Sequence, residues 1–266
     1  MKSNRRYIPK PVNKPLDIVQ KLLKEPILYD EFLQLLEKSS DKMYEDPQLE
    51  FELLLSNGLP LDFIEENKVC LRTNYTNIKD QTFCIVDIET NGSNVKKGHQ
   101  IIELGAVKYK NGQIIDKFES LVFAKEIPEF VQEVTNIVPS MLENAPRLET
   151  VLKEFKIFLQ DDVFVAHDIK FDYNFVSESF EKFSLGKLLN RKICTIDLAK
   201  RTIKAEKYGL SSLKELLNID IENHHRAYFD ALTTAIVFEK CLANLGDEIK
   251  TTEDLIRFSK SDSIIK

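Results

Sequence analysis

The stretch from 83 to 123 carries the pattern that most restricts the fold. Three segments, at 83–89, about 100–109 and 113–123, are rich in the apolar and β-branched residues typical of β-strands. Asn111 and Gly112 separate the last two segments, and Asn-Gly is a favoured pair for a two-residue hairpin turn. The sequence therefore predicts that a sheet begins here with strands that are consecutive in the chain.

After this stretch the pattern alternates between helix and strand. One face of a predicted helix at about 147–160 carries Leu148, Val151, Leu152, Phe155 and Leu159. The further predicted elements are strands at 162–167 and 192–197 and helices at about 170–183, 211–217 and 226–244. Strands first, then alternating helices and strands, predict an α/β domain at 82–245 in which helices flank a mixed sheet.

The N-terminal part has a different pattern. Residues 1–15 are expected to form a flexible basic tail because prolines interrupt them. Residues 16–75 show three short helical patterns and a hairpin that turns near Glu66 and Asn67, the outline of a small winged-helix-like module, and a linker is expected at 73–82. The third helix carries Asp46, Glu50 and Glu52. A helix that reads DNA should be basic, so we expect this module to pack or to contact protein.

The net charge of −6 does not indicate a nucleic-acid-binding protein. Its distribution is uneven, because the segment from Lys182 to Lys207 has eight basic residues and only two acidic ones, Asp197 and Glu206. A basic segment in an acidic protein is a candidate for contact with phosphate. A solvated helix surface explains the same charges equally well.

Two acidic residues stand at the end of the first predicted strand. Asp87 and Glu89 follow the run Phe83-Cys84-Ile85-Val86 and precede the turn residues Asn91 and Gly92. Side chains alternate along a strand, so both carboxylates are expected on one side and Ile88 on the other. Such a pair is common on exposed strands. At the edge of a buried sheet, where active sites collect, it indicates a functional site.

Further acidic residues occur in similar settings. Asp168 and Asp172 follow the strand at 162–167, together with His167, and Asp230 follows His224 and His225. Taken singly, each is explained as a helix cap or a residue at a helix start. Taken together, four carboxylates in one cleft require cations. Oxygen ligands favour two divalent ions, Mg²⁺ or Mn²⁺, over zinc, and such a pair suits phosphodiester chemistry.

Three motifs, in order over about 160 residues, resemble the DEDDh family of 3′→5′ exonucleases, the DnaQ-like proofreading group. "DIETNG" resembles D-x-E-T-x-G, "VAHDIKFD" resembles A-H-N-x-x-F-D, and "HRAYFDA" fits H-x-A-x-x-D-A. "GHQIIELGAVKYKNGQIIDKF" resembles the strand-turn-strand segment of the family. The five-residue spacing to Asp230 selects His225 over His224 and the histidine branch over the tyrosine branch. The sequence departs from the family at Asn91 and Asp168.

The resemblance implies an RNase H-like fold with a mixed five-stranded sheet. It implies that Asp87, Glu89, Asp172 and Asp230 hold two metal ions, with Asp87 shared between them. His225 would act as the general base, because an unperturbed imidazole, with a pKa of about 6.5, can accept a proton at neutral pH. Thr90, Asn91 and His167 are expected to contact the terminal nucleotide.

The function implied is hydrolysis of terminal phosphodiesters in single-stranded DNA or at a frayed 3′ end, in proofreading like that of the epsilon subunit of bacterial DNA polymerase III. The polymerase catalytic subunit would then be the partner. One alternative is a stand-alone exonuclease that acts on RNA 3′ ends or small DNA. Another is an inactive binding or assembly module, which the presence of all five catalytic residue types disfavours.

Residues 246–266 read as a mostly polar C-terminal tail with two interpretations. The segment "EDLIRF" loosely resembles peptides that dock on sliding clamps, through Ile256 and Phe258, although Glu253 replaces the usual Gln. An extended peptide would insert alternate apolar side chains into pockets of the clamp. The favoured interpretation is a short amphipathic helix, capped by Thr252, that packs on the domain.

A cytoplasmic protein without a membrane partner is expected. No apolar run approaches the roughly 18 residues that a membrane span needs, and the basic N-terminus lacks the apolar region of a secretory signal. The cysteines, which form no C-x-x-C pair, are expected to be buried thiols in a reducing compartment. They are Cys70, Cys84, Cys194 and Cys241.

Overall fold

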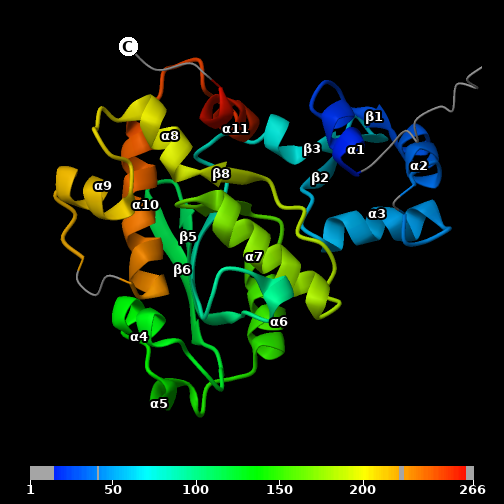
Figure 1. The fold of residues 1–266 in the computed structure, drawn as a ribbon. Helices are drawn as coiled ribbons and strands as arrows, with labels where there is room; N and C mark the ends of the chain where they lie inside the picture. Colours follow the sequence, from blue (N-terminus) through cyan, green and yellow to red (C-terminus); the bar gives the residue numbers. More distant parts are fainter. Residues whose placement is uncertain (1–14, 41, 222–224, 262–266) are drawn as a thin grey trace, which may run out of the picture.

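The structure is a computed structural model that describes residues 15–40, 42–221 and 225–261, with the side chains from residue 18 onward. Figure 1 shows a larger α/β body beside a smaller group of N-terminal elements.

The N-terminal elements are three helices and a small antiparallel sheet. The helices are α1 (Pro15–Leu22), α2 (Tyr29–Glu37) and α3 (Pro47–Ser56), and the strands β1 (Ile27–Leu28), β2 (Leu61–Ile64) and β3 (Lys68–Leu71) lie in the order β1-β3-β2. Ile18, Phe32 and Phe51 are among the buried residues of their shared core. The hairpin turn uses positive φ at Glu65 and Glu66, close to the predicted turn. The two-residue strand β1 was not predicted.

The central sheet has the mixed arrangement that the sequence predicts. Its strands are β4 (Phe83–Thr90), β5 (Ile101–Lys110), β6 (Gln113–Leu121), β7 (Val163–Ala166) and β8 (Lys192–Cys194), in the order β6-β5-β4-β7-β8. Pairs β4–β5 and β5–β6 are antiparallel, whereas β4–β7 and β7–β8 are parallel. Asn111 and Gly112 both have positive φ, as a type I′ hairpin turn demands.

Helices cover both faces of this sheet (Figure 1). On one face α6 (Leu148–Leu159) and α7 (Ile169–Lys182) pack with Cys84, Val86 and Ile88. On the other face α8 (Thr195–Thr202), α9 (Leu210–Leu216) and α10 (Ala227–Ala243) pack with Phe83 and Ile85. The alternation along β4 therefore places Asp87 and Glu89 on the α10 side. No helix within the described ranges is long and apolar enough to cross a membrane.

Three parts of this body differ from the predicted elements. Two short helices, α4 (Glu129–Thr135) and α5 (Pro139–Leu142), lie between β6 and α6, where no helix was predicted. They are too short to show a helical period in the sequence. The strand predicted at 192–197 ends at Cys194, and α8 begins at Thr195.

The C-terminal residues form α11 (Thr252–Lys260), so the helical interpretation describes them and an extended tail does not. Thr251, one residue before the predicted cap, accepts a hydrogen bond from the Asp254 backbone N–H at 3.1 Å, and the Asp254 carboxylate accepts one from the Thr251 N–H at 3.0 Å. This reciprocal capping box satisfies both amides. Ile256 and Phe258 are 1% and 8% exposed, so both side chains are buried in the protein.

The predicted linker, residues 73–82, packs against α11 and against the residues just before that helix. The Thr73 hydroxyl donates to the Glu253 carboxylate at 2.9 Å, and the Ile78 N–H donates to the Lys250 carbonyl at 3.2 Å. Arg72 forms an ion pair with Asp161 at 2.7 Å. These contacts join the N-terminal elements to the α/β body.

Candidate active site

The end of β4 supplies two carboxylates. Asp87 pairs with Gly105 of β5, and Glu89 pairs with Glu103. The register shifts after Glu89, as at a β-bulge, which re-aims the chain at a sheet edge. Both acidic side chains line one cavity, as the strand period predicts.

The first turn of α7 supplies the third carboxylate. The chain leaves β7 at Ala166 and turns at Asp168, whose φ is +76°. This left-handed residue directs the chain into α7 and brings Asp172 back toward the end of β4. The Asp172 side chain is 4% exposed.

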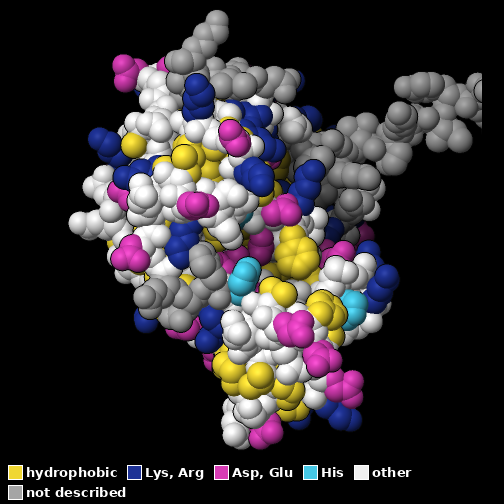
Figure 2. Space-filling view, turned by 60° about the vertical axis from the view of Figure 1, so that its left-hand side comes forward, with side chains coloured by type: hydrophobic (Ala, Val, Ile, Leu, Met, Phe, Trp, Pro, Cys, Tyr) yellow, Lys and Arg dark blue, Asp and Glu magenta, His cyan; other side chains and the backbone are white. Residues whose placement is uncertain are grey.

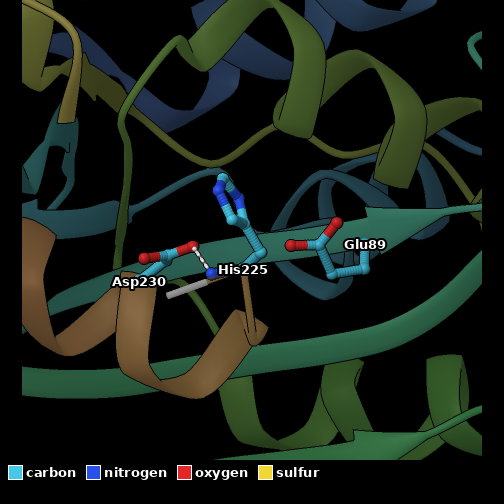
Figure 3. Close-up of side chains that lie close together, drawn as sticks. All are labelled: Glu89, His225 and Asp230. Carbon is cyan, nitrogen blue, oxygen red and sulfur yellow. Dashed lines mark hydrogen bonds between the residues drawn. The ribbon is translucent and has the colours of Figure 1, made fainter. Parts of the chain in front are cut away.

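The entry to α10 supplies the fourth carboxylate and the histidine. His225 has a φ of +60°, and its backbone N–H donates to the Asp230 carboxylate at 3.1 Å. Figure 3 shows this bond and the Glu89 carboxylate on the neighbouring strand. Asp230 is 7% exposed, whereas His225 is exposed. His224 lies outside the described residues.

The predicted catalytic residues line one cavity of about 270 Å³. Asp87, Glu89, Asp172, His225 and Asp230 all line it. Three further lining residues have no role predicted from the sequence motifs, namely Phe171, Leu210 and Ser211. Figure 2 shows acidic side chains in a hollow of the surface, with a histidine and hydrophobic side chains beside them.

Burial and mutual repulsion shift the titration of these acids. Burial raises the pKa of Asp87 well above its usual value, and the carboxylates of Asp172, Glu89 and Asp230 raise it further. Burial and the Asp230 and Glu103 carboxylates raise the pKa of Glu89 to about 8, although Arg226 opposes the shift. Burial also raises the pKa of Asp172, against backbone N–H groups that favour its charged form. Without a cation, the cluster therefore disfavours full ionisation.

The donor set fits divalent metal ions. Glu89, His225 and Asp230 offer ligand atoms that lie within 4.8 Å of one another, and Asp87 and Asp172 line the same cavity. Carboxylate oxygens are the ligands that Mg²⁺ and Mn²⁺ prefer. Cations bound here would offset the repulsion between carboxylates that helps to raise the pKa values of Asp87 and Glu89.

A buried ion pair outside the predicted set holds the α10 entry on the sheet. Glu103 is fully buried, and its carboxylate accepts hydrogen bonds from Arg226 Nε at 2.9 Å, Arg226 Nη2 at 2.7 Å and the Ala227 N–H at 3.0 Å. These bonds fix Arg226 and Ala227, at the start of the helix that carries Asp230, next to the strand position that pairs with Glu89. In the sequence, Glu103 stands out as the single acid inside the apolar run "IIELGAV", and this was the signal for a buried ion pair.

Of the three residues expected to contact the nucleotide, His167 and Asn91 have side chains that bond to other parts of the protein. His167 lines the cavity, but its ring nitrogens lie 2.9 Å from Thr195 Oγ1 and 2.9 Å from the Tyr208 carbonyl. Burial lowers the pKa of His167. The Asn91 side-chain oxygen accepts from the Gln100 N–H at 2.7 Å. Neither Asn91 nor Thr90 lines the cavity.

Comparison with protein families gives one match over most of the α/β body. Residues 84–238 match the RNase_T family, described as an exonuclease family. This range includes all four carboxylates and His225.

Relatives include DNA polymerase III of the PolC type from Staphylococcus epidermidis and from Staphylococcus aureus. Each is 36% identical over 198 residues, which cover 73% of this chain. The chain spans only 13% of the length of these relatives.

Solved structures share the fold. Exonuclease X in complex with 5′ overhanging duplex DNA superposes with a TM-score of 0.52 at 23% identity, over 66% of this chain and 99% of that chain. The nuclease domain of 3′hExo, a DEDDh family member bound to rAMP, gives a TM-score of 0.51 at 18% identity, over 61% of this chain and 92% of that chain.

Proposed function

Because this chain belongs to the DEDDh, DnaQ-like group of 3′→5′ exonucleases, we propose that it removes nucleotides from DNA 3′ ends by a two-metal mechanism and proofreads beside a replicative polymerase. One observation carries this proposal. Four carboxylates from three separate segments, β4, α7 and the α10 entry, line one cavity together with His225. Gathering four acids in one cavity, two of them buried and two half-buried, has no stability rationale without cations.

In the proposed site, Asp87, Glu89, Asp172 and Asp230 would hold two divalent ions, Mg²⁺ or Mn²⁺. When bound, such ions polarise the scissile phosphate and neutralise the carboxylates. The hydrogen bond from the His225 N–H to Asp230 ties the position of the histidine to that of a metal ligand.

His225 accepts the proton of the water that attacks phosphorus. The water oxygen bonds to phosphorus, the bond from phosphorus to the 3′ oxygen breaks, and that oxygen takes a proton from solvent. The products are a nucleoside 5′-monophosphate and a strand shortened by one nucleotide. Phe171, which is 38% exposed at the cavity, offers a surface on which a terminal base can stack.

The replication role rests on the similarity to PolC-type polymerases. The 36% identity covers 13% of the length of those relatives. We propose that a polymerase catalytic subunit is the partner of this domain, in the manner of the epsilon subunit. The burial of Ile256 and Phe258 gives no support to docking on a sliding clamp.

The test is a nuclease assay of the full chain with Mg²⁺ or Mn²⁺, on 3′-labelled single-stranded DNA, mispaired duplex and RNA in parallel, with Asp87→Ala as the inactive control. We expect release of mononucleotides from DNA, faster from the mispaired than from the paired end. A clear preference for RNA would favour the stand-alone RNA exonuclease instead. No release from any substrate would favour an assembly module.

A further inference from the structure

A second cavity, of about 430 Å³, lies where the N-terminal elements meet the α/β body. Val19 and Leu23 of the N-terminal region, Tyr173 of α7, Lys192 of β8 and Ile256 of α11 are among its lining residues. It shares no residue with the candidate active site. The Arg257 guanidinium donates to the Leu23 carbonyl at 2.8 Å, so α11 and the N-terminal region are in direct contact beside it.

The charged side chains of this cavity are nearly all basic. Arg191, Lys192, Arg257 and Lys260 line it, with Glu253 as the single carboxylate. Arg191 and Lys192 belong to the basic segment Lys182 to Lys207. The proposed function does not explain the charge of that segment. Glu253 is already engaged, because it forms an ion pair with Arg191 and accepts the Thr73 hydroxyl at 2.9 Å.

Within the part of the chain that the structure describes, neither Lys192 nor Lys260 forms an ion pair, although the Glu253 carboxylate opposes the lowering of the Lys260 pKa. The Lys192 ammonium lies over the Tyr173 ring, 3.5 Å from its centroid, a cation–π contact. Burial, together with the positive charges of Lys260 and Arg191, lowers the pKa of Lys192 to about 8. Four basic groups thus share one carboxylate, which Arg191 already engages, so a bound anion would lower their mutual repulsion.

The rest of the lining is apolar and aromatic. Val19, Leu23, Leu59 and Ile256 contribute aliphatic surface, and Tyr173 contributes a ring. A volume of about 430 Å³ falls within the range of small-molecule sites, which run from about 300 to about 1,000 Å³. The lining thus offers basic groups to a phosphate and apolar surface to a flat group.

We propose that this cavity binds a mononucleotide, with the phosphate on Lys192, Lys260 and Arg191 and the base against the aliphatic wall. Basic side chains form charge-assisted hydrogen bonds with phosphate oxygens. The walls come from both parts of the chain, so an occupant links the N-terminal elements to the α/β body.

The test is isothermal titration calorimetry of the full chain in EDTA, which keeps metal-dependent binding at the active site out of the signal. The probes are adenosine 5′-monophosphate, inorganic phosphate and adenosine. We expect adenosine 5′-monophosphate to bind more tightly than phosphate, and adenosine not to bind detectably. Equal binding of adenosine would overturn phosphate recognition, and equal binding of phosphate would overturn the nucleotide assignment.

Three variants locate the binding. Lys192→Met and Lys260→Gln should each weaken the affinity for adenosine 5′-monophosphate by about tenfold, the effect of one lost charge-assisted hydrogen bond. Lys200→Gln is the matched control, because Lys200 comes from the same basic segment, has a 52% exposed side chain and does not line the cavity. Unchanged affinity in both cavity variants, or no binding by the wild type, would overturn the proposal.

A second measurement needs no substitution. A lysine with a lowered pKa is acylated faster near neutral pH, because its amine is more often uncharged. Mass spectrometry should therefore show acetylation of Lys192 that adenosine 5′-monophosphate suppresses, while acetylation of Lys200 stays unchanged. Equal acetylation of Lys192 with and without the nucleotide would contradict the proposed site.

Discussion

At the scale of single residues, the active-site carboxylates are built for function at a cost in stability. Asp172 and Asp230 are 4% and 7% exposed, and burial together with neighbouring acids raises the pKa of Asp87. Buried acids of one sign destabilise the fold unless cations accompany them. This conflict between folding and function can be measured one residue at a time.

Replacing Asp87 by alanine should abolish nuclease activity and leave the protein folded. Because the substitution removes one repelling carboxylate, the metal-free variant should melt higher than the metal-free wild type, by about 2–4 °C for each kcal/mol of relieved strain. Activity and melting in EDTA are the two measurements. Retention of more than a few per cent of the activity at saturating Mn²⁺ would count against Asp87 as a metal ligand.

Replacing His225 by alanine should lower kcat by about 10²- to 10⁴-fold, the usual contribution of a general base. Metal affinity should fall far less than kcat, because all four carboxylates remain and the bond to Asp230 comes from the backbone of residue 225. His225→Asn is a useful second variant, since asparagine tolerates the positive φ at this position. The control is His224→Ala, which should be nearly silent, and a reversed order of the two histidines would refute the assignment.

The stability of the metal-free protein should fall as pH rises. The pKa of Glu89 is raised from 4.5 to about 8, so between these pH values the unfolded chain loses a proton that the folded chain keeps. The unfolded state then binds fewer protons, and the free energy of unfolding decreases with pH across this window. The shifts of Asp87 and Asp172 act in the same direction.

Thermal melts in EDTA at several pH values from about 5 to about 8 test this linkage. Mg²⁺ or Mn²⁺ should restore stability most at the upper end, because the metal binds the deprotonated acids. In Glu89→Gln the decline should be shallower. A metal-free protein that gains stability over this range would contradict the raised pKa values.

At the scale of elements, the site depends on how closely α10 approaches the sheet. Gly105 of β5 lies opposite Asp87, and a Cβ added there would collide with the backbone of Ala227 and Tyr228. The first turn of α10 therefore rests directly on the strand, and Glu103 holds it there through Arg226. This contact fixes the separation between Asp87 on one element and Asp230 on the other.

Gly105→Ala should push the start of α10 off the sheet. We expect a destabilisation of about 1–3 kcal/mol, as for other overpacked sites, and a fall in kcat because His225 and Asp230 move with the helix. Denaturant melts and steady-state kinetics measure the two effects. Gly209→Ala is the matched control, because its Cβ would meet no atom. Unchanged kcat in Gly105→Ala would show that the close approach does not position the site.

At the scale of the whole molecule, α11 joins the two parts of the chain. Leu255, Ile256 and Phe258 are buried in the core beside α10, while Arg257 and Glu253 contact Leu23 and Thr73. The helix thus belongs to the folded body, and its removal should affect the whole protein.

Truncation after Gly246 should lower the melting temperature and the nuclease activity together. Each fully buried apolar side chain that is lost contributes about 1.5–3 kcal/mol. Truncation after Ser261, which removes residues 262–266 alone, is the matched control. If the shorter chain keeps its melting temperature and activity and only fails to associate with a polymerase partner, the segment is a docking peptide after all.

The sequence by itself determined what depends on local pattern. Strand alternation placed Asp87 and Glu89 on one side, Asn111 and Gly112 identified the hairpin, and the helical pattern at about 226–244 located α10. These features depend on residues a few positions apart, so the backbone period alone makes them readable.

Only the tertiary structure decided how distant segments meet. It paired Glu103 with Arg226. It bonded the side chains of Asn91 and His167 to other parts of the protein. It also brought Lys192 and Lys260 to one cavity. Such contacts join residues from different segments of the chain, and they form only when the sheet and helices pack together. No local propensity encodes them, since their free energy exists only after the chain has folded.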